Sequence, residues 1–337
     1  MGKLCEGSVL DGFQPVSPLK LPWQDGFKEK EEESFLSDLS DLRENSGWDA
    51  VSGLQERQRR ALQGLSSKGV FWKHPSKPLA ELFLLFHGGD VDTDGNCLFT
   101  ASRKAMRLSD HPEDLRKRVV DRFSDDYQAG ICPRADTDAA IKNMYQPDLE
   151  AGWGVHFVQE LKFLALKKDR QRLDSLIEDL IRVGVSREAA AEAVYKERCI
   201  PVKDGESWVK YMSINGNSRD EYDIISMHYT QEGLLTVDEN RDGKAAAFGD
   251  DIAIETLATV FDREFYVVQA HGSDGSSDEE ACLFFLPHPP RGSQATGLPV
   301  FLLMRGTGWC CAGADHYEPL IAYAAACASQ EKAAVIL

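Results

Sequence analysis

Residues 92 to 106 read DTDGNCLFTASRKAM, and this stretch decides the fold because it joins a short acidic turn to an amphipathic helix. Its apolar residues recur at helical spacing up to Leu108, which predicts a helix over residues 97–108. Cys97 therefore stands in the first helical turn, where backbone N–H groups have no partner within the helix. Structural cysteines usually lie among apolar neighbours inside an element, so the position of Cys97 needs a chemical explanation.

The turn before this helix suits a cysteine nucleophile. The positive end of the helix dipole favours the thiolate, which is the reactive form of the side chain. The turn at Asp94, Gly95 and Asn96 could direct backbone N–H groups at one point, as an oxyanion hole requires, and Gly95 permits a positive φ. We therefore expect Cys97 to be a thiolate. The alternative is a buried, small apolar residue.

A thiolate nucleophile needs a base, and His316 is the best placed of the eight histidines. Most of the others lie in loops or beside prolines, where we expect them at the surface. His316 instead begins the apolar run HYEPLIAY (316–323), which predicts a β-strand. Glu318 lies two residues further on the same strand face, so its carboxylate could orient the imidazole. The alternative is a structural histidine at a strand end.

Helical patterns precede β-rich runs along the chain. Residues 111–123 (HPEDLRKRVVDRF) and 156–198 have helical periodicity. The last third instead holds short β-rich runs separated by loops, namely FYVVQA (265–270), CLFFL (282–286), VFLLM (300–304) and HYEPLIAY (316–323). This order predicts an α+β domain with an antiparallel or mixed sheet rather than a doubly wound one.

Composition narrows the classes of function. The 337 residues contain 38 Lys and Arg against 55 Asp and Glu, a net charge of −17, so we expect no nucleic-acid partner. No apolar window is long enough for a membrane span or a signal peptide, which predicts a cytoplasmic or nuclear protein. Its eight cysteines should then be reduced thiols. None forms a C-x-x-C pair, so we expect no metal and no other cofactor.

An early cysteine on a helix and a late histidine on a strand follow the chain order of papain-like cysteine hydrolases. DGNCLF (94–99) together with HYEPL (316–320) resembles the ovarian-tumour (OTU) family of cysteine deubiquitinases. SWVKYM (207–212) is similar to the family's Trp-x-x-Tyr segment. FGDDIAIETLATVFDREFYVV (248–268) is similar to its helix followed by a strand. The resemblance covers about residues 80–323, in pieces.

The resemblance implies a papain-like OTU fold, with helices packed around a small central β-sheet. It makes Cys97 the nucleophile, His316 the general base and later acid, and the turn from Asp94 to Cys97 the oxyanion hole. The implied reaction is hydrolysis of the isopeptide bond after the C-terminal glycine of ubiquitin, through an acyl-enzyme thioester. The implied partners are ubiquitin or polyubiquitin chains. The family usually has Asn or Asp where this chain has Glu318, so Asp315 or a residue elsewhere could orient His316 instead.

The resemblance also divides the chain. We expect an acidic N-terminal tail (1–46), a helical extension with a linker (47–79), a catalytic domain (80–325) and a C-terminal tail (326–337). Two insertions interrupt the domain, at about 156–200 and 213–247. The first faintly resembles two helices of a ubiquitin-associated domain, with a plain helical hairpin packed on the core as the alternative. The second is polar enough to be a mobile loop over the cleft, with Ile224, Ile225 and Tyr229 packing inward.

Two other functions stay open at this point. The chain could be a non-catalytic ubiquitin-binding scaffold on an OTU fold, although a scaffold has no need of both Cys97 and His316. It could also be a papain-like hydrolase that acts on another ubiquitin-like modifier.

Overall fold

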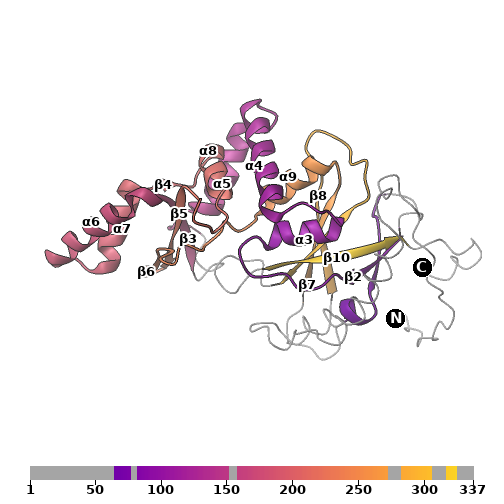
Figure 1. The fold of residues 1–337 in the computed structure, drawn as a ribbon, viewed down its shortest axis with the longest axis horizontal. Helices are drawn as coiled ribbons and strands as arrows, with labels where there is room; N and C mark the ends of the chain where they lie inside the picture. Colours follow the sequence, from indigo (N-terminus) through magenta and orange to yellow (C-terminus); the bar gives the residue numbers. More distant parts are fainter. Residues whose placement is uncertain (1–63, 77–81, 152–157, 272–281, 306–315, 325–337) are drawn as a thin grey trace, which may run out of the picture.

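A computed structural model of the chain describes residues 64–76, 82–151, 158–271, 282–305 and 316–324 (Figure 1). The predicted tails and Asp315 lie outside these ranges. The helices are α3 (Cys97–Met106), α4 (Pro112–Gln128), α5 (Arg134–Tyr145), the short 3-10 helix η3 (Lys167–Asp169), α6 (Arg170–Arg182), α7 (Arg187–Arg198), α8 (Gly205–Met212) and α9 (Asp251–Phe261). The strands are β1 (Val70–Lys73), β2 (Leu82–His87), β3 (Gln159–Leu166), β4 (Ile200–Pro201), β5 (Tyr222–Thr230), β6 (Gly233–Asp238), β7 (Phe265–His271), β8 (Cys282–His288), β9 (Val300–Arg305) and β10 (His316–Ala324).

The main sheet has the strand order β1-β2-β10-β9-β7-β8. Strands β7 and β9 are parallel and the other neighbours are antiparallel, so the sheet is mixed. The four β-rich runs predicted in the last third form β7 to β10, which confirms the α+β class. The helix predicted at residues 97–108 is α3, which ends slightly earlier because Arg107 adopts a left-handed conformation with φ of 56°.

Helices cover one face of this sheet, and α3 packs directly on β10 (Figure 1). The main core lies between them and contains Leu98, Phe99 and Trp208 together with Val267 and Leu302 of the sheet. The opposite face carries a separate aromatic cluster in which Trp72 packs against Phe301 and Tyr266. The sheet is therefore buried on both faces around β10, the central strand that carries His316.

The two predicted insertions fold together into a second sheet, of order β4-β3-β5-β6. Strand β3 of the first insertion pairs antiparallel with β5 of the second. The helical pattern assigned to residues 159–166 was therefore wrong, because these residues form a strand in which buried Leu161 and Phe163 alternate with the more exposed Glu160 and Lys162. The segment 213–247, expected to be a mobile loop, contains the β5–β6 hairpin, which spans residues 222–238.

Burial in this lobe follows one of the predictions. Ile224, Ile225 and Tyr229 pack inward, as the sequence indicated. Helices α6 and α7 form a hairpin that covers the second sheet with Ile177 and Tyr195. In Figure 1 this hairpin projects away from the main sheet.

Strand β1 comes from the segment that the sequence assigned to an extension before the catalytic domain. It pairs with β2, so the main sheet includes residues before position 80. His74 directly follows this strand and was expected at the surface. It is instead buried, with Nε2 lying 2.8 Å from Glu264 Oε2, because the aromatic cluster covers it. Among the residues described, no helix is both long and apolar enough to span a membrane.

Candidate active site

The turn before α3 has the backbone shape that its sequence predicted. Gly95 has a φ of +81°, and a Cβ at this position would lie 2.6 Å from the Ala246 side chain. Glycine is therefore required both for the conformation and for the close approach of Ala246. The carboxylate of Asp94 accepts a hydrogen bond from the Asn96 N–H at 2.8 Å, which closes the turn.

Two backbone N–H groups of this turn, those of Gly95 and Cys97, donate to no acceptor among the described residues. The Asn96 carbonyl accepts the N–H of Thr100 at 2.9 Å. Because the peptide unit is trans, the Cys97 N–H points the opposite way, out of the helix N-terminus. The Asn96 N–H is already taken by Asp94. Of the N–H groups expected from the sequence to form an oxyanion hole, those of Gly95 and Cys97 are therefore the two candidate donors.

Cys97 is only 2% exposed and forms no disulfide. Burial raises the pKa of its thiol, while backbone hydrogen bonds from Tyr317 and Leu98 lower the pKa by a smaller amount. The predicted thiolate is therefore not the favoured form in this structure. The helix dipole carries only about half a charge, and desolvation of a buried thiolate outweighs it.

His316 lies at the first position of β10 and is 4% exposed. Its Nε2 lies 2.9 Å from the carbonyl oxygen of Val91, which can only accept a hydrogen bond. Nε2 must therefore carry the proton, and Nδ1 carries the lone pair that a general base needs. Burial lowers the pKa of His316, which keeps the ring neutral.

Cys97 contacts β10 at Tyr317, the residue that follows His316. The Tyr317 backbone donates a hydrogen bond to the Cys97 thiol, so the predicted nucleophile lies beside the strand that carries the predicted base. No hydrogen bond joins Cys97 to His316 directly within the described ranges. Catalytic hydrogen bonds of free enzymes often tighten only when substrate binds.

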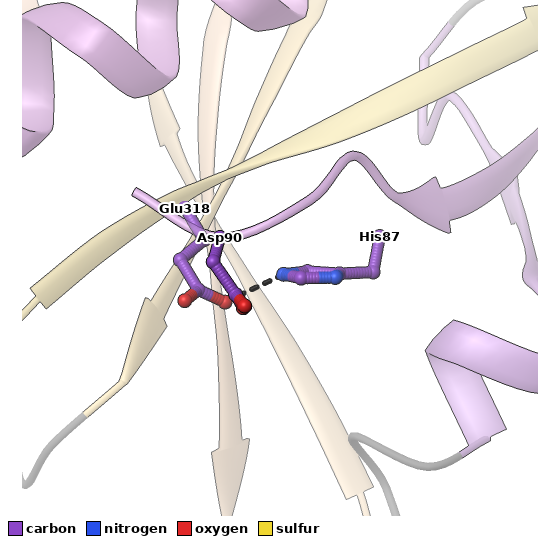
Figure 2. A group of neighbouring side chains, drawn as sticks. All are labelled: His87, Asp90 and Glu318. Atoms are coloured by element: carbon purple, nitrogen blue, oxygen red, sulfur yellow. Dashed lines mark hydrogen bonds and ion pairs between the residues drawn. The ribbon is translucent and has the colours of Figure 1, made fainter. Parts of the chain in front are cut away.

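Glu318 is fully buried beneath His316, but its carboxylate is held by other groups. Its Oε2 lies 2.6 Å from His87 Nε2 (Figure 2). Its Oε1 forms an ion pair with Arg305. The distance from Oε1 to His316 Nε2 is 4.0 Å, too long for a hydrogen bond. The Val91 carbonyl therefore orients the imidazole, and Glu318 acts on it only through its charge. His87 was expected at the surface, yet its side chain is 10% exposed because β10 carries this partner.

His87, Asp90 and Glu318 bring their ligand atoms within 4.8 Å of one another, although the sequence predicted no metal site (Figure 2). A histidine and two carboxylates are a donor set that zinc accepts. Arg305, however, already pairs with Glu318 and would repel a cation. The 2.6 Å contact between His87 and Glu318 is that of a charge-assisted hydrogen bond. We interpret the contact between His87 and Glu318 as a buried hydrogen bond that holds the Glu318 carboxylate in place near His316.

Sequence reasoning missed Arg116, which lies under the turn before α3 and is 1% exposed. Its guanidinium donates to Asn96 Oδ1 at 3.0 Å, to the Gly95 carbonyl at 2.9 Å and to the Met212 carbonyl at 3.1 Å. A signal was present, because Arg116 shares the apolar face of its helix with residues three, four and seven positions later. A charged residue on such a face needs buried partners.

The two other segments that carry the OTU resemblance meet beside β10. The Trp208 indole donates to Asp250 Oδ2 at 2.7 Å, which joins α8 to the start of α9. The backbone N–H of Phe248 donates to the Tyr211 hydroxyl at 3.2 Å, and the Phe248 ring stacks on Tyr317 at 5.4 Å. Phe248 thus packs against the residue next to His316, in line with a packing role for this aromatic side chain.

Comparison with known proteins adds no relative, since no protein-family model matches the chain and no curated protein is significantly similar to it.

Proposed function

We propose that this chain is a cysteine hydrolase with a papain-like OTU fold, which cleaves the isopeptide bond after the C-terminal glycine of ubiquitin. The observation that carries the proposal is the hydrogen bond from the Tyr317 backbone to the Cys97 thiol. This contact sets the cysteine at the start of α3 against the strand residue next to His316. Because the two residues lie more than 200 positions apart in the sequence, chance proximity is a weak explanation.

The residues suggest a course for the reaction. Nδ1 of His316 takes the proton of the Cys97 thiol, and the thiolate attacks the glycine carbonyl carbon. The oxyanion that forms receives hydrogen bonds from the N–H groups of Gly95 and Cys97. His316 then gives its proton to the leaving lysine amine, and a thioester remains on Cys97. Water, deprotonated by His316, attacks the thioester and releases the ubiquitin carboxylate and the free thiol.

The charge of the chain is consistent with this substrate. A net charge of −17 would favour encounter with a ubiquitin tail that carries arginines. A hydrolase of ubiquitin conjugates would act in the cytoplasm or nucleus, and the reaction needs no metal or other cofactor. Polyubiquitin chains contain the same isopeptide bond and would be substrates of the same reaction.

One observation favours a second function. Cys97 is almost fully buried and the pKa of its thiol is raised, as expected for a cysteine that serves packing. A non-catalytic ubiquitin-binding scaffold on the same fold would have these properties. A hydrolase of another ubiquitin-like modifier would share the catalytic residues but reject ubiquitin.

The test is covalent labelling with full-length ubiquitin that carries a thiol-reactive electrophile at its C-terminus. The active enzyme should form a one-to-one adduct that mass spectrometry maps to Cys97. Cys97→Ala should form none, and His316→Ala should lose most of the labelling. Binding of ubiquitin without an adduct would support the scaffold. Labelling only by probes made from other ubiquitin-like proteins would support a hydrolase of another ubiquitin-like modifier.

A further inference from the structure

The Gly95–Asn96 peptide unit of the turn before α3 is held from both ends. Its carbonyl oxygen accepts a hydrogen bond from Arg116 Nη2 at 2.9 Å. Its N–H donates to the Asp94 carboxylate at 2.8 Å. Carbonyl and N–H point in opposite directions in a trans peptide, so these two contacts fix the orientation of the peptide plane.

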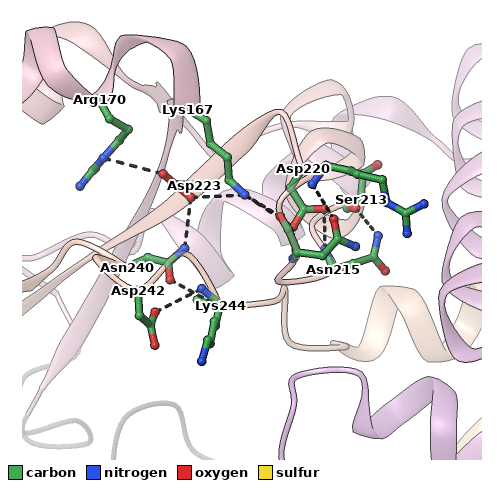
Figure 3. A network of polar contacts seen from close by, with 12 residues as sticks. Lys167, Arg170, Ser213, Asn215, Asp220, Asp223, Asn240, Asp242 and Lys244 are labelled. Carbon is green, nitrogen blue, oxygen red and sulfur yellow. Dashed lines mark hydrogen bonds and ion pairs between the residues drawn. The ribbon is translucent and has the colours of Figure 1, made fainter.

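The Asn96 side chain extends this support. Its Oδ1 accepts from Arg116 Nε at 3.0 Å, and its Nδ2 donates to the Asn215 carbonyl at 3.3 Å. The Asn215 segment is itself anchored, because the Asp220 carboxylate accepts the backbone N–H of Asn215 at 3.1 Å (Figure 3). A third Arg116 contact, to the Met212 carbonyl, ties the same guanidinium to the end of α8.

The fixed peptide unit stands directly between the two candidate oxyanion donors. The Gly95 N–H precedes it, the Cys97 N–H follows it, and neither has an acceptor in the part of the chain that the structure describes. An oxyanion hole works because its donors are already aimed before the charge develops. Rotation of the Gly95–Asn96 plane would move both donors, since they flank it on the backbone.

We infer that Arg116 is a positioning residue for the oxyanion hole, which it aligns by holding the Gly95 carbonyl and the Asn96 side chain at once. The inference rests on the proposed hydrolase function and deepens it. Only the planar guanidinium offers several N–H donors in a fixed fork, so a lysine at this position cannot reproduce the contacts.

Arg116 also acts through its charge, and this effect must be separated from its geometry. Burial lowers the pKa of Arg116 to about 10, so the side chain stays protonated at neutral pH. That charge lowers the pKa of the Cys97 thiol by a small amount. Lysine keeps the charge and loses the fork. Arg116→Lys therefore tests the geometry with the charge in place.

The experiment compares the wild type, R116K and R118K in hydrolysis of ubiquitin that carries a fluorogenic amide at its C-terminus. Arg118 lies on the same helix, and its side chain is 47% exposed, so R118K is the matched control. R116K should lower kcat by about 100-fold, as loss of an oxyanion donor does, with KM changed less than about threefold. R118K should behave as the wild type.

Alkylation of Cys97 by iodoacetamide supplies the readout that a merely structural role would change. Its rate should be the same in R116K and the wild type, because alkylation needs the thiol but no oxyanion hole. A wild-type kcat in R116K would overturn the inference. So would equal losses of kcat and alkylation, which would indicate general damage around Cys97.

If R116K does not fold, Asn96→Ala tests the same arrangement from the acceptor side. It should lower kcat at an unchanged alkylation rate, and an unchanged kcat would overturn the inference. A folded wild type that is alkylated yet hydrolyses no ubiquitin amide would overturn the proposed function and this inference together. A wild type that is active beside a fully active R116K would overturn this inference alone.

Discussion

His316 donates its Nε2–H to the carbonyl oxygen of Val91 across 2.9 Å. A main-chain carbonyl has no titratable proton, so this partner fixes the tautomer without adding a charge of its own. In a triad with a carboxylate in this place, the carboxylate both orients the imidazole and stabilises the imidazolium. Here the two tasks are divided, because Val91 orients the ring and the Glu318 charge acts from 4.0 Å.

This division predicts that the acidic limb of the pH profile of kcat/KM lies at low pH. Burial lowers the pKa of His316 from its ordinary value of 6.5, and Arg305 lowers the pKa further, while Glu318 raises it. A base must be unprotonated, so activity should fall only when the pH drops below 6.5. Glu318→Gln removes a negative charge and should move this limb to still lower pH. A limb above pH 6.5, or a shift to higher pH in E318Q, would contradict the assignment.

The reactivity of Cys97 in the free protein should rise with pH up to alkaline values. Burial raises the pKa of the thiol above its ordinary value of 9.0, so the midpoint of the iodoacetamide rate profile should lie above pH 9. Mass spectrometry of the peptide that contains Cys97 separates its alkylation from that of the other cysteines, and C97A provides the blank. A plateau reached at neutral pH would instead show a preformed thiolate–imidazolium pair.

His87 should contribute to stability through the buried carboxylate of Glu318. His87→Ala removes the 2.6 Å hydrogen bond and should lower the free energy of unfolding by about 1–3 kcal/mol. Urea denaturation measures the change. The control is His111→Ala, because His111 is exposed and makes no side-chain cap bond, and it should change the free energy by less than about 0.5 kcal/mol. Equal effects of the two substitutions would refute the supporting role of His87.

Substitution of the buried Asp250 should strongly lower the stability of the protein. Asp250 caps α9 by accepting the Ala253 N–H at 2.8 Å, and it also accepts from Tyr145 at 2.5 Å and from Trp208 at 2.7 Å. Asp250→Ala removes the carboxylate that accepts these three hydrogen bonds and should lower the free energy of unfolding by roughly 2–4 kcal/mol. Asp125→Ala, on the exposed face of α4, is the control for thermal and urea denaturation. A loss below about 1 kcal/mol for D250A would show that water replaces the carboxylate.

Local patterns predicted the parts of the site that depend on local geometry. The turn at Gly95, the helix that begins at Cys97 and the strand that begins at His316 all follow from spacing and residue type. Local patterns did not predict the ionisation state of Cys97, because it depends on burial by β10, which lies far away in the sequence.

Local sequence patterns also could not predict hydrogen-bond partners that belong to other elements of the fold. Arg116 serves carbonyl groups from a different turn, and the Val91 carbonyl takes the place expected for Glu318. Neither partner leaves a spacing signal of its own. The strand β3 was misread because LKFLAL is apolar at both helical and alternating positions, and only pairing with β5 decides between them.

The α6–α7 hairpin should be required for folding of the lobe built from the two insertions. Ile177 and Tyr195 of the hairpin cover Ile225 and Met227 of β5, so deletion of residues 170–198 would expose this apolar core. The deleted protein should aggregate or lose cooperative unfolding. The control is Val183→Ser at the hairpin tip, which is 77% exposed and should leave the midpoint unchanged. A soluble, cooperatively folded deletion variant that binds ubiquitin more weakly would instead favour the ubiquitin-associated alternative for these two helices.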